Sequence, residues 1–277
     1  MVITLYGDYI RHTGGSIQIG ALVQLLSHFG VSQQAIRSTI SRMKRNSLLR
    51  VERKGSRSLY SMTTSGAKMI EAGATRIFQF PSYQDAWDGQ WQLITYSIPE
   101  SEREARDRLR QELSWMGFGM LTNALWIAPH NHRPEIQTLA DDLGIRSNIE
   151  IFTARHDGFS TPQSIVEHCW NLKSINARYA AFVKKYEPMY NEHCRLLAQG
   201  KDIEPSEYFV RRFTLIHEFR RFPYLDPELP TELLPSDWQG AQAANLFRQY
   251  HDLLADKANQ FFSTVYQNGK MTDSRRS

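Results

Sequence analysis

The sequence predicts an α+β protein with three domains. Three observations support this prediction: two helical patterns and a basic hairpin pattern fill residues 19–63, strand and helix patterns alternate over residues 91–154, and an aromatic-rich helical pattern follows from residue 162. The predicted domains are residues 1–80, 81–160 and 161–277, the last one helical. Three domains suit a chain of 277 residues.

The first domain begins with two helices joined by a tight turn. Apolar residues recur at helical spacing over residues 19–26, and Phe29-Gly30 ends this helix. Ser32 is a favourable N-cap for a second helix. At 100° per residue, Ile36, Ile40 and Met43 share one face of that second helix. The opposite face carries Gln34, Arg37, Ser38, Ser41, Arg42 and Arg45.

This polar face has the chemistry of a helix that reads the major groove of double-stranded DNA. Arginine can bridge the O6 and N7 atoms of guanine, glutamine can pair with adenine, and serine can contact phosphates or base edges. We therefore predict that the six polar residues contact DNA.

A basic hairpin follows the second helix. Residues 48–52 and 58–62 are extended patterns that flank Arg53-Lys54-Gly55-Ser56-Arg57, and Gly55 permits positive φ at the turn. Arg53, Lys54 and Arg57 would lie along the phosphate backbone. Helices and hairpin together predict a winged helix-turn-helix. The alternative interpretation is a solvated basic hairpin on an ordinary α+β domain.

The charge distribution favours the DNA-binding interpretation. Residues 1–80 hold 11 Lys or Arg and 3 Asp or Glu, a net charge of +8. The whole chain has a net charge of +4, so the remaining residues carry −4. A basic first segment on a mildly acidic remainder indicates a nucleic-acid-binding module joined to domains of another function.

The second domain is predicted as a ferredoxin-like βαββαβ unit. A helix over residues 64–78 and a linker over residues 80–89 precede it. The pattern then predicts a strand, a helix, a strand or hairpin, a helix and a strand over residues 91–98, 100–116, 119–128, 134–143 and 149–154. This order resembles the small nuclease-like fold of the CRISPR adaptation machinery. Those nucleases place a metal-binding Asp after the first strand, where this chain has Ser97-Ile98-Pro99, so no nuclease activity is expected.

An enzyme is the competing class of protein, and the sequence offers little support for it. GxSxG, HExxH and a Gly-rich phosphate loop are all missing. His130 and His132 could ligate a metal, although surface polar residues are the favoured interpretation, and no metal is predicted. Cys169 and Cys194 lack metal-binding spacing and are expected to be reduced.

No membrane association is expected. The sequence has no run of about eighteen apolar residues, and its start lacks the charged and long apolar regions of a secretory signal. A cytoplasmic location is therefore expected.

The third domain combines aromatic residues with paired arginines. Arg211-Arg212 and Arg220-Arg221 are predicted on overlapping faces of one helix close to His217, where they could bind phosphate or carboxylate groups. The alternative is a solvated face paired with Glu218 and other acids. A last helix is predicted over residues 241–266, followed by a disordered tail over residues 268–277.

Four segments resemble a known family across almost the whole chain. They are LYGDYIRHTGG, SQQAIRSTISRMKRNSLL, GSRSLYSMT and FRRFPYLDPELPTELLPSDWQGAQAANLF. They are similar to PaaX-type transcriptional repressors. The resemblance implies a bacterial repressor of phenylacetic acid catabolic genes, with a winged-helix domain, a ferredoxin-like domain and a helical domain. It also implies that phenylacetyl-CoA releases the repressor from its operator. A family regulator that responds to another acyl-CoA, aryl-CoA or small molecule is the alternative.

A CoA thioester needs an apolar slot beside a cationic lip. The residues beyond Trp170 offer both, and no cofactor other than this effector is expected. The candidates for the polar end are Arg211, Arg212, His217, Arg220 and Arg221, and those for the acyl group are Trp170, Tyr179 and Trp238. The competing interpretation makes residues 226–240, with Trp238, a rigid structural turn that docks the last helix. A homodimer is expected, because two recognition helices would read two half-sites.

Overall fold

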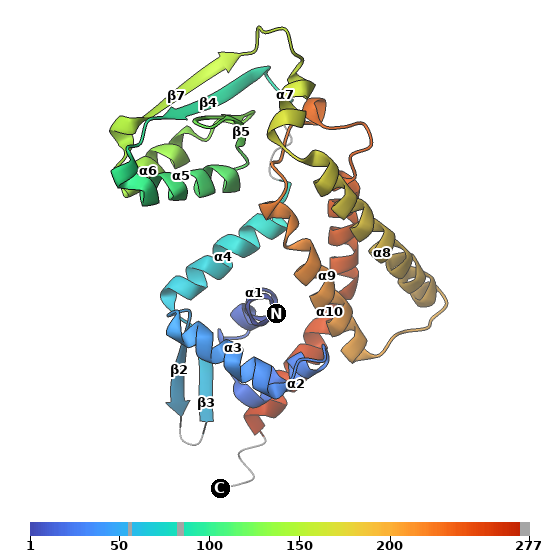
Figure 1. Ribbon diagram of the computed structural model, residues 1–277. Coiled ribbons are helices and arrows are strands. Elements are labelled where there is room, and N and C mark those ends of the chain that lie inside the picture. The colour runs from blue at the N-terminus through green and yellow to red at the C-terminus, as the bar shows by residue number, and fades with distance from the viewer. Residues whose placement is uncertain (55–56, 82–85, 272–277) are drawn as a thin grey trace. The chain divides into compact units, whose positions relative to one another are not determined.

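The computed structural model describes residues 1–54, 57–81 and 86–271. Helices and two small antiparallel sheets make up this part of the chain, which confirms the α+β class (Figure 1). The chain divides into two compact units. Unit 1 comprises residues 1–80, 182–220 and 242–277, and unit 2 comprises residues 81–181 and 221–241. The predicted segment 161–277 contributes to both units, and the three-domain boundaries stay a prediction.

The N-terminal part of unit 1 contains the expected helices and hairpin. The elements are α1 (Val2–Asp8), η1 (Ile10–His12), β1 (Ser16–Gln18), α2 (Ile19–Ser27), α3 (Gln33–Arg45), β2 (Leu49–Lys54), β3 (Arg57–Met62) and α4 (Thr64–Phe78). Their strands form an antiparallel sheet in the order β1-β3-β2, with Tyr60 opposite both Ile17 and Val51. The predicted turn at Gly55 and Ser56 lies outside the described residues.

Local side chains explain where α3 and α4 begin. The Ser32 hydroxyl accepts a hydrogen bond from the Ala35 amide at 3.2 Å, and Thr63 does the same for Gly66 at 3.1 Å. These caps satisfy amides that have no partner within the helix. Gly30 has φ of 69°, so glycine allows the chain to turn sharply between α2 and α3.

Three longer helices complete unit 1. They are the C-terminal part of α8 (Leu172–Ala198), α9 (Pro205–Phe219) and α10 (Gly240–Met271). Aromatic contacts join these helices to the N-terminal elements: Tyr9 stacks on Phe262 with ring centroids 5.0 Å apart, and Phe29 lies 4.4 Å from Phe213. The disordered tail predicted from Asn268 is wrong for residues 268–271, which continue α10, while residues 272–277 lie outside the described residues.

Unit 2 contains a four-stranded sheet, and the helices that follow its first and third strands cover one face (Figure 1). In chain order the elements are β4 (Gln90–Tyr96), η2 (Glu100–Glu102), α5 (Arg103–Trp115), β5 (Gly119–Thr122), β6 (Leu125–Ala128), α6 (Arg133–Leu143), η3 (Arg146–Asn148) and β7 (Ile149–Arg155). The strand order is β5-β6-β4-β7, and all neighbours are antiparallel. The predicted helix over 100–116 therefore starts as a 3-10 turn. Part of the predicted linker, residues 82–85, lies outside the described residues.

Each face of this sheet has its own apolar cluster. Ile94 and Trp126 pack with Leu109 of α5 and Ile136 of α6. On the other face, Trp91 belongs to a cluster formed with α7 (Pro162–Cys169) and residues near η5 (Thr231–Leu233). The segment that links η4 (Phe222–Tyr224) to α10 thus packs within unit 2.

Candidate functional site

Helix α3 presents the polar face that its sequence predicts. Three apolar side chains are at most 6% exposed and hold the helix against the rest of unit 1: Ile36, Ile40 and Met43. The opposite side is exposed to solvent along its length, as predicted. We call this side the recognition face, and its residues are Gln34, Arg37, Ser38, Ser41, Arg42 and Arg45.

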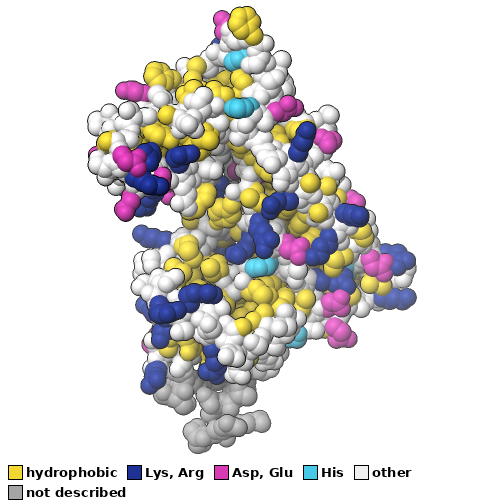
Figure 2. All heavy atoms as spheres, viewed as in Figure 1, with side chains coloured by type: hydrophobic (Ala, Val, Ile, Leu, Met, Phe, Trp, Pro, Cys, Tyr) yellow, Lys and Arg dark blue, Asp and Glu magenta, His cyan; other side chains and the backbone are white. Residues whose placement is uncertain are grey.

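The arginines of the recognition face are free to bind a partner. Within the described part of the chain, Arg37, Arg42 and Arg45 form no ion pair and no side-chain hydrogen bond. Figure 2 shows Lys and Arg side chains on the part of unit 1 that carries α3, with few acidic side chains among them. Such a surface attracts polyanions.

The basic hairpin follows α3 directly. Arg53 is exposed on β2, and Lys54 pairs with Arg57 at the last described position of the β2–β3 ladder. The Tyr6 hydroxyl donates a hydrogen bond of 2.8 Å to the Tyr60 carbonyl, which ties β3 to α1. The phosphate-binding role of Arg53, Lys54 and Arg57 stays a prediction.

Two of the predicted effector residues, Arg211 and Arg212, are occupied by contacts within unit 1. Arg211 donates to Glu207 and, at 3.3 Å, to the Tyr250 hydroxyl. Arg212 donates to Asp8 at 3.0 Å, and the side chains of this pair are only 7% and 5% exposed.

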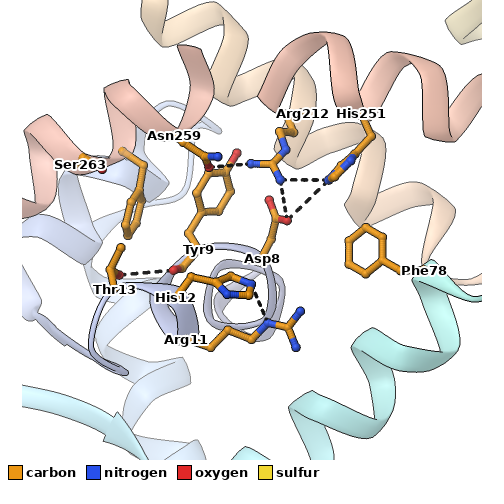
Figure 3. Close-up of a pocket in the computed structure, with 11 residues that line it drawn as sticks. Asp8, Tyr9, Arg11, His12, Thr13, Phe78, Arg212, His251, Asn259 and Ser263 are labelled. Carbon is orange, nitrogen blue, oxygen red and sulfur yellow. Dashed lines mark hydrogen bonds and ion pairs between the residues drawn. The ribbon is translucent and has the colours of Figure 1, made fainter. Parts of the chain in front are cut away.

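The buried pair joins three helices (Figure 3). Asp8 ends α1, Arg212 lies in α9, and α10 contributes Asn259, which accepts from Arg212 at 2.8 Å, and His251, whose Nε2 lies 3.0 Å from the guanidinium. Asp8, His251 and Asn259 are not predicted from the sequence. No periodic pattern links Asp8 to an arginine 204 positions away.

His217 and the second arginine pair differ from the prediction. His217 Nδ1 lies 3.0 Å from the Thr4 hydroxyl, and its ring stacks on Phe213. The prediction that both arginine pairs lie on one helix is wrong, because α9 ends at Phe219 and Arg220 is its C-cap. Pro223 follows, and because it has no backbone N–H to donate to the Phe219 carbonyl, the α-helix does not continue through it.

The three predicted acyl-group residues lie in unit 2, where each makes structural contacts. Trp170 Nε1 donates to the Gly117 carbonyl at 3.0 Å. Tyr179 is fully buried, packs edge-on against Trp238 with centroids 5.5 Å apart, and donates to Asp226 at 2.7 Å. Burial raises the pKa of Asp226 to about 6.

The predicted effector set is therefore divided between the two units. Arg211, Arg212, His217 and Arg220 belong to unit 1, whereas Arg221, Trp170, Tyr179 and Trp238 belong to unit 2. Their role as one effector site stays a prediction.

Comparisons with known proteins identify the family. Residues 1–66 match the model of a PaaX-like protein, residues 84–166 that of the PaaX protein central Cas2-like domain, and residues 170–264 that of the PaaX-like protein C-terminal domain. The chain is also 31% identical over 268 residues to the transcriptional repressor PaaX of Escherichia coli (strain K12), covering 95% of this chain and 82% of the relative. The chain belongs to the PaaX family.

A solved structure shows the same fold. An uncharacterized protein from Mycobacterium tuberculosis superimposes with a TM-score of 0.60 at 18% identity, covering 94% of this chain and 96% of the other. The Escherichia coli relative is a transcriptional repressor, which agrees with the prediction that the chain is a regulator and not an enzyme.

The two histidines considered for metal binding, His130 and His132, contact other residues of unit 2. His130 Nε2 lies 2.7 Å from the Glu228 carbonyl oxygen. The surface interpretation is wrong for His132, which is 8% exposed and whose pKa is lowered by burial. The described residues contain no group of three or more metal-ligating side chains. None of the helices in this part of the chain combines the length and apolar character needed to cross a bilayer.

Proposed function

We propose that this member of the PaaX family is a transcriptional repressor that binds double-stranded operator DNA through α3. The observation that carries the proposal is the recognition face, where Arg37, Arg42 and Arg45 are exposed and form no ion pair with any described residue. Three exposed guanidinium groups on one helix face can contact base edges or phosphates. The repressor name of the Escherichia coli relative agrees with this role.

The arrangement around α3 supports a winged helix-turn-helix. Helices α2 and α3 are joined by a short turn at Gly30, and the β2–β3 hairpin follows at once. In this geometry α3 enters the major groove, and Arg53 on the hairpin contacts flanking phosphates. The strand order of unit 2, with all neighbours antiparallel, supports a ferredoxin-like central domain.

Specific repression requires more than one recognition helix. A homodimer would present two copies of α3 to half-sites that are about one helical turn apart, or a multiple of that distance. Its operators would lie upstream of phenylacetic acid catabolic genes, and phenylacetyl-CoA would release the protein, as the resemblance to the family implies. An effector can do so only as far as it binds the released conformation more tightly. A different acyl-CoA or aryl-CoA is the alternative effector.

An anisotropy titration tests the proposal. Labelled DNA from upstream of the gene cluster that encodes the protein is titrated at fixed salt, with and without phenylacetyl-CoA. Specific binding that the thioester abolishes, and that free phenylacetate and free CoA leave unchanged, is the expected result. Specific binding in the presence of saturating thioester would contradict the proposal that phenylacetyl-CoA is the effector. Equal affinity for operator and random DNA would contradict the repressor function itself.

A further inference from the structure

Helix α1 is a buried element of unit 1 to which the proposed function assigns no role. Five of its seven residues are buried, so it lies inside unit 1 and not on the DNA-binding surface. It overlaps residues 5–15, one of the four segments that resemble the PaaX family. Any effect of α1 on DNA binding must therefore act through the elements that it contacts.

Two side chains on one face of α1 attach it to α9. Thr4 and Asp8 are four residues apart, so they share a face of the helix. The Thr4 hydroxyl lies 3.0 Å from His217 Nδ1. Asp8 accepts a hydrogen bond of 3.0 Å from Arg212. These two contacts fix α1 to α9 at points that are about one helical turn apart along α1.

The opposite face of α1 contacts the basic hairpin. Tyr6 lies midway in sequence between the two anchoring side chains, which places it about 160° around the helix from each of them. Its side chain is 1% exposed, and its hydroxyl donates a hydrogen bond of 2.8 Å to the Tyr60 carbonyl. Tyr60 lies in β3, the central strand of the sheet, and the neighbouring strand β2 carries Arg53. One side chain of α1 therefore holds the hairpin that carries the exposed positive charge.

The contacts on both faces place α1 between α9 and the hairpin. A hairpin that is already held in its DNA-bound position loses less conformational freedom on binding, and so binds more tightly. We propose that α1 positions the basic hairpin for DNA, with Tyr6 as the positioning residue and α9 as the anchor. This inference rests on the proposed function, because it requires that Arg53 contacts phosphates. A displacement of α9 would then move the hairpin through α1, without any contact between α9 and DNA.

The DNA affinity of full-length Tyr6→Phe protein tests the proposal. The variant removes only the hydroxyl that holds β3, so affinity for the labelled upstream DNA at fixed salt should fall about fivefold, as expected for one hydrogen bond. Tyr266→Phe is the matched control, because it removes a hydroxyl that donates to the Thr13 carbonyl at 2.7 Å, outside the hairpin. The control should bind DNA like the wild type. Wild-type affinity in Tyr6→Phe, or equal losses of affinity in the two variants, would overturn the proposal.

A double-mutant cycle with Arg53→Ala separates positioning from a general loss of structure. If Tyr6 acts through the hairpin, Tyr6→Phe should cost less than about twofold in Arg53→Ala protein, because the contact that it positions is already lost. Equal losses in the wild-type and Arg53→Ala backgrounds would overturn the proposal. Failure of the repressor function itself is distinguishable, because the wild-type chain would then bind upstream and random DNA equally.

Thr4→Val tests the anchor on α9. Valine is similar in shape to threonine but lacks the hydroxyl that contacts His217. DNA affinity should fall by about two- to threefold. The variant that combines Thr4→Val with Tyr6→Phe should bind as tightly as Tyr6→Phe alone, since both changes act through α1. Wild-type affinity in Thr4→Val, or a combined loss equal to the product of the two single losses, would overturn the role of α9 as the anchor.

Discussion

The arginines of α3 and those of α9 belong to the same unit but differ in their exposure and in their contacts. Arg37, Arg42 and Arg45 are exposed and form no ion pair with any described residue. Arg211 and Arg212 instead donate to Glu207 and Asp8. An arginine on a helix therefore indicates a partner outside the protein only if its side chain is known to be exposed. On α3 the partner we propose is DNA, whereas on α9 the partners lie within the protein.

The largest expected effect on stability comes from removing the ion pair between Arg212 and Asp8. Arg212→Ala leaves the Asp8 carboxylate buried without its cation, so the free energy of unfolding should fall by about 3 to 5 kcal/mol. Urea denaturation measures this change. Arg37→Ala, on the exposed face of α3, is the control and should change stability by less than about 0.5 kcal/mol. Equal effects of the two variants would remove the contrast between the helices.

The free energy of unfolding should depend on pH through Asp226, a buried carboxylate that forms no ion pair with any described residue. The pKa of Asp226 is raised from 3.8 to about 6, since burial outweighs its hydrogen bond from Tyr179. The folded state therefore holds the proton more tightly, and this contribution to stability is complete below pH 4 and lost as the pH rises through about 6. The loss is on the order of 3 kcal/mol. In the Asp226→Asn variant, the unfolding free energies at pH 4 and pH 7 should differ by less than they do in the wild type. A variant whose unfolding free energy changes with pH as much as that of the wild type would show that another group titrates.

The N-cap of α3 should matter for stability by a smaller amount. Ser32→Ala removes the acceptor for the Ala35 amide and should cost about 1 kcal/mol in urea denaturation. Ser38→Ala, within the same helix and also exposed, is the matched control and should cost nothing measurable. If both serines behave alike, the cap does not hold the start of the recognition helix.

Arg53 sharpens the distinction between base contacts and phosphate contacts. Arg53→Ala should weaken binding to specific and random DNA alike, and should reduce the slope of log affinity against log salt by about one. Anisotropy titrations at several salt concentrations measure both quantities. A loss confined to the specific sequence would instead make Arg53 a base-reading residue.

Sequence periodicity predicted the local features well and the long-range ones poorly. The buried face of α3, its cap at Ser32 and the order of elements in unit 2 depend on neighbours in the chain, and the structure bears these out. The contact of Arg212 with Asp8 depends on how distant helices pack, which no spacing encodes. The end of α9 is a local feature that the periodicity misses, because it depends on Pro223 and not on the spacing of apolar residues.

DNA affinity of a variant with both Arg42→Ala and Arg45→Ala tests the central claim most directly. The two changes lie on the exposed face of α3, so the melting temperature should stay unchanged. Affinity for operator DNA at fixed salt should fall by at least about 1 to 3 kcal/mol, the cost of one lost base contact. Arg103→Ala on α5 removes an exposed charge in unit 2 and should bind like the wild type. Wild-type affinity in the α3 variant, with the fold intact, would contradict DNA recognition by this helix.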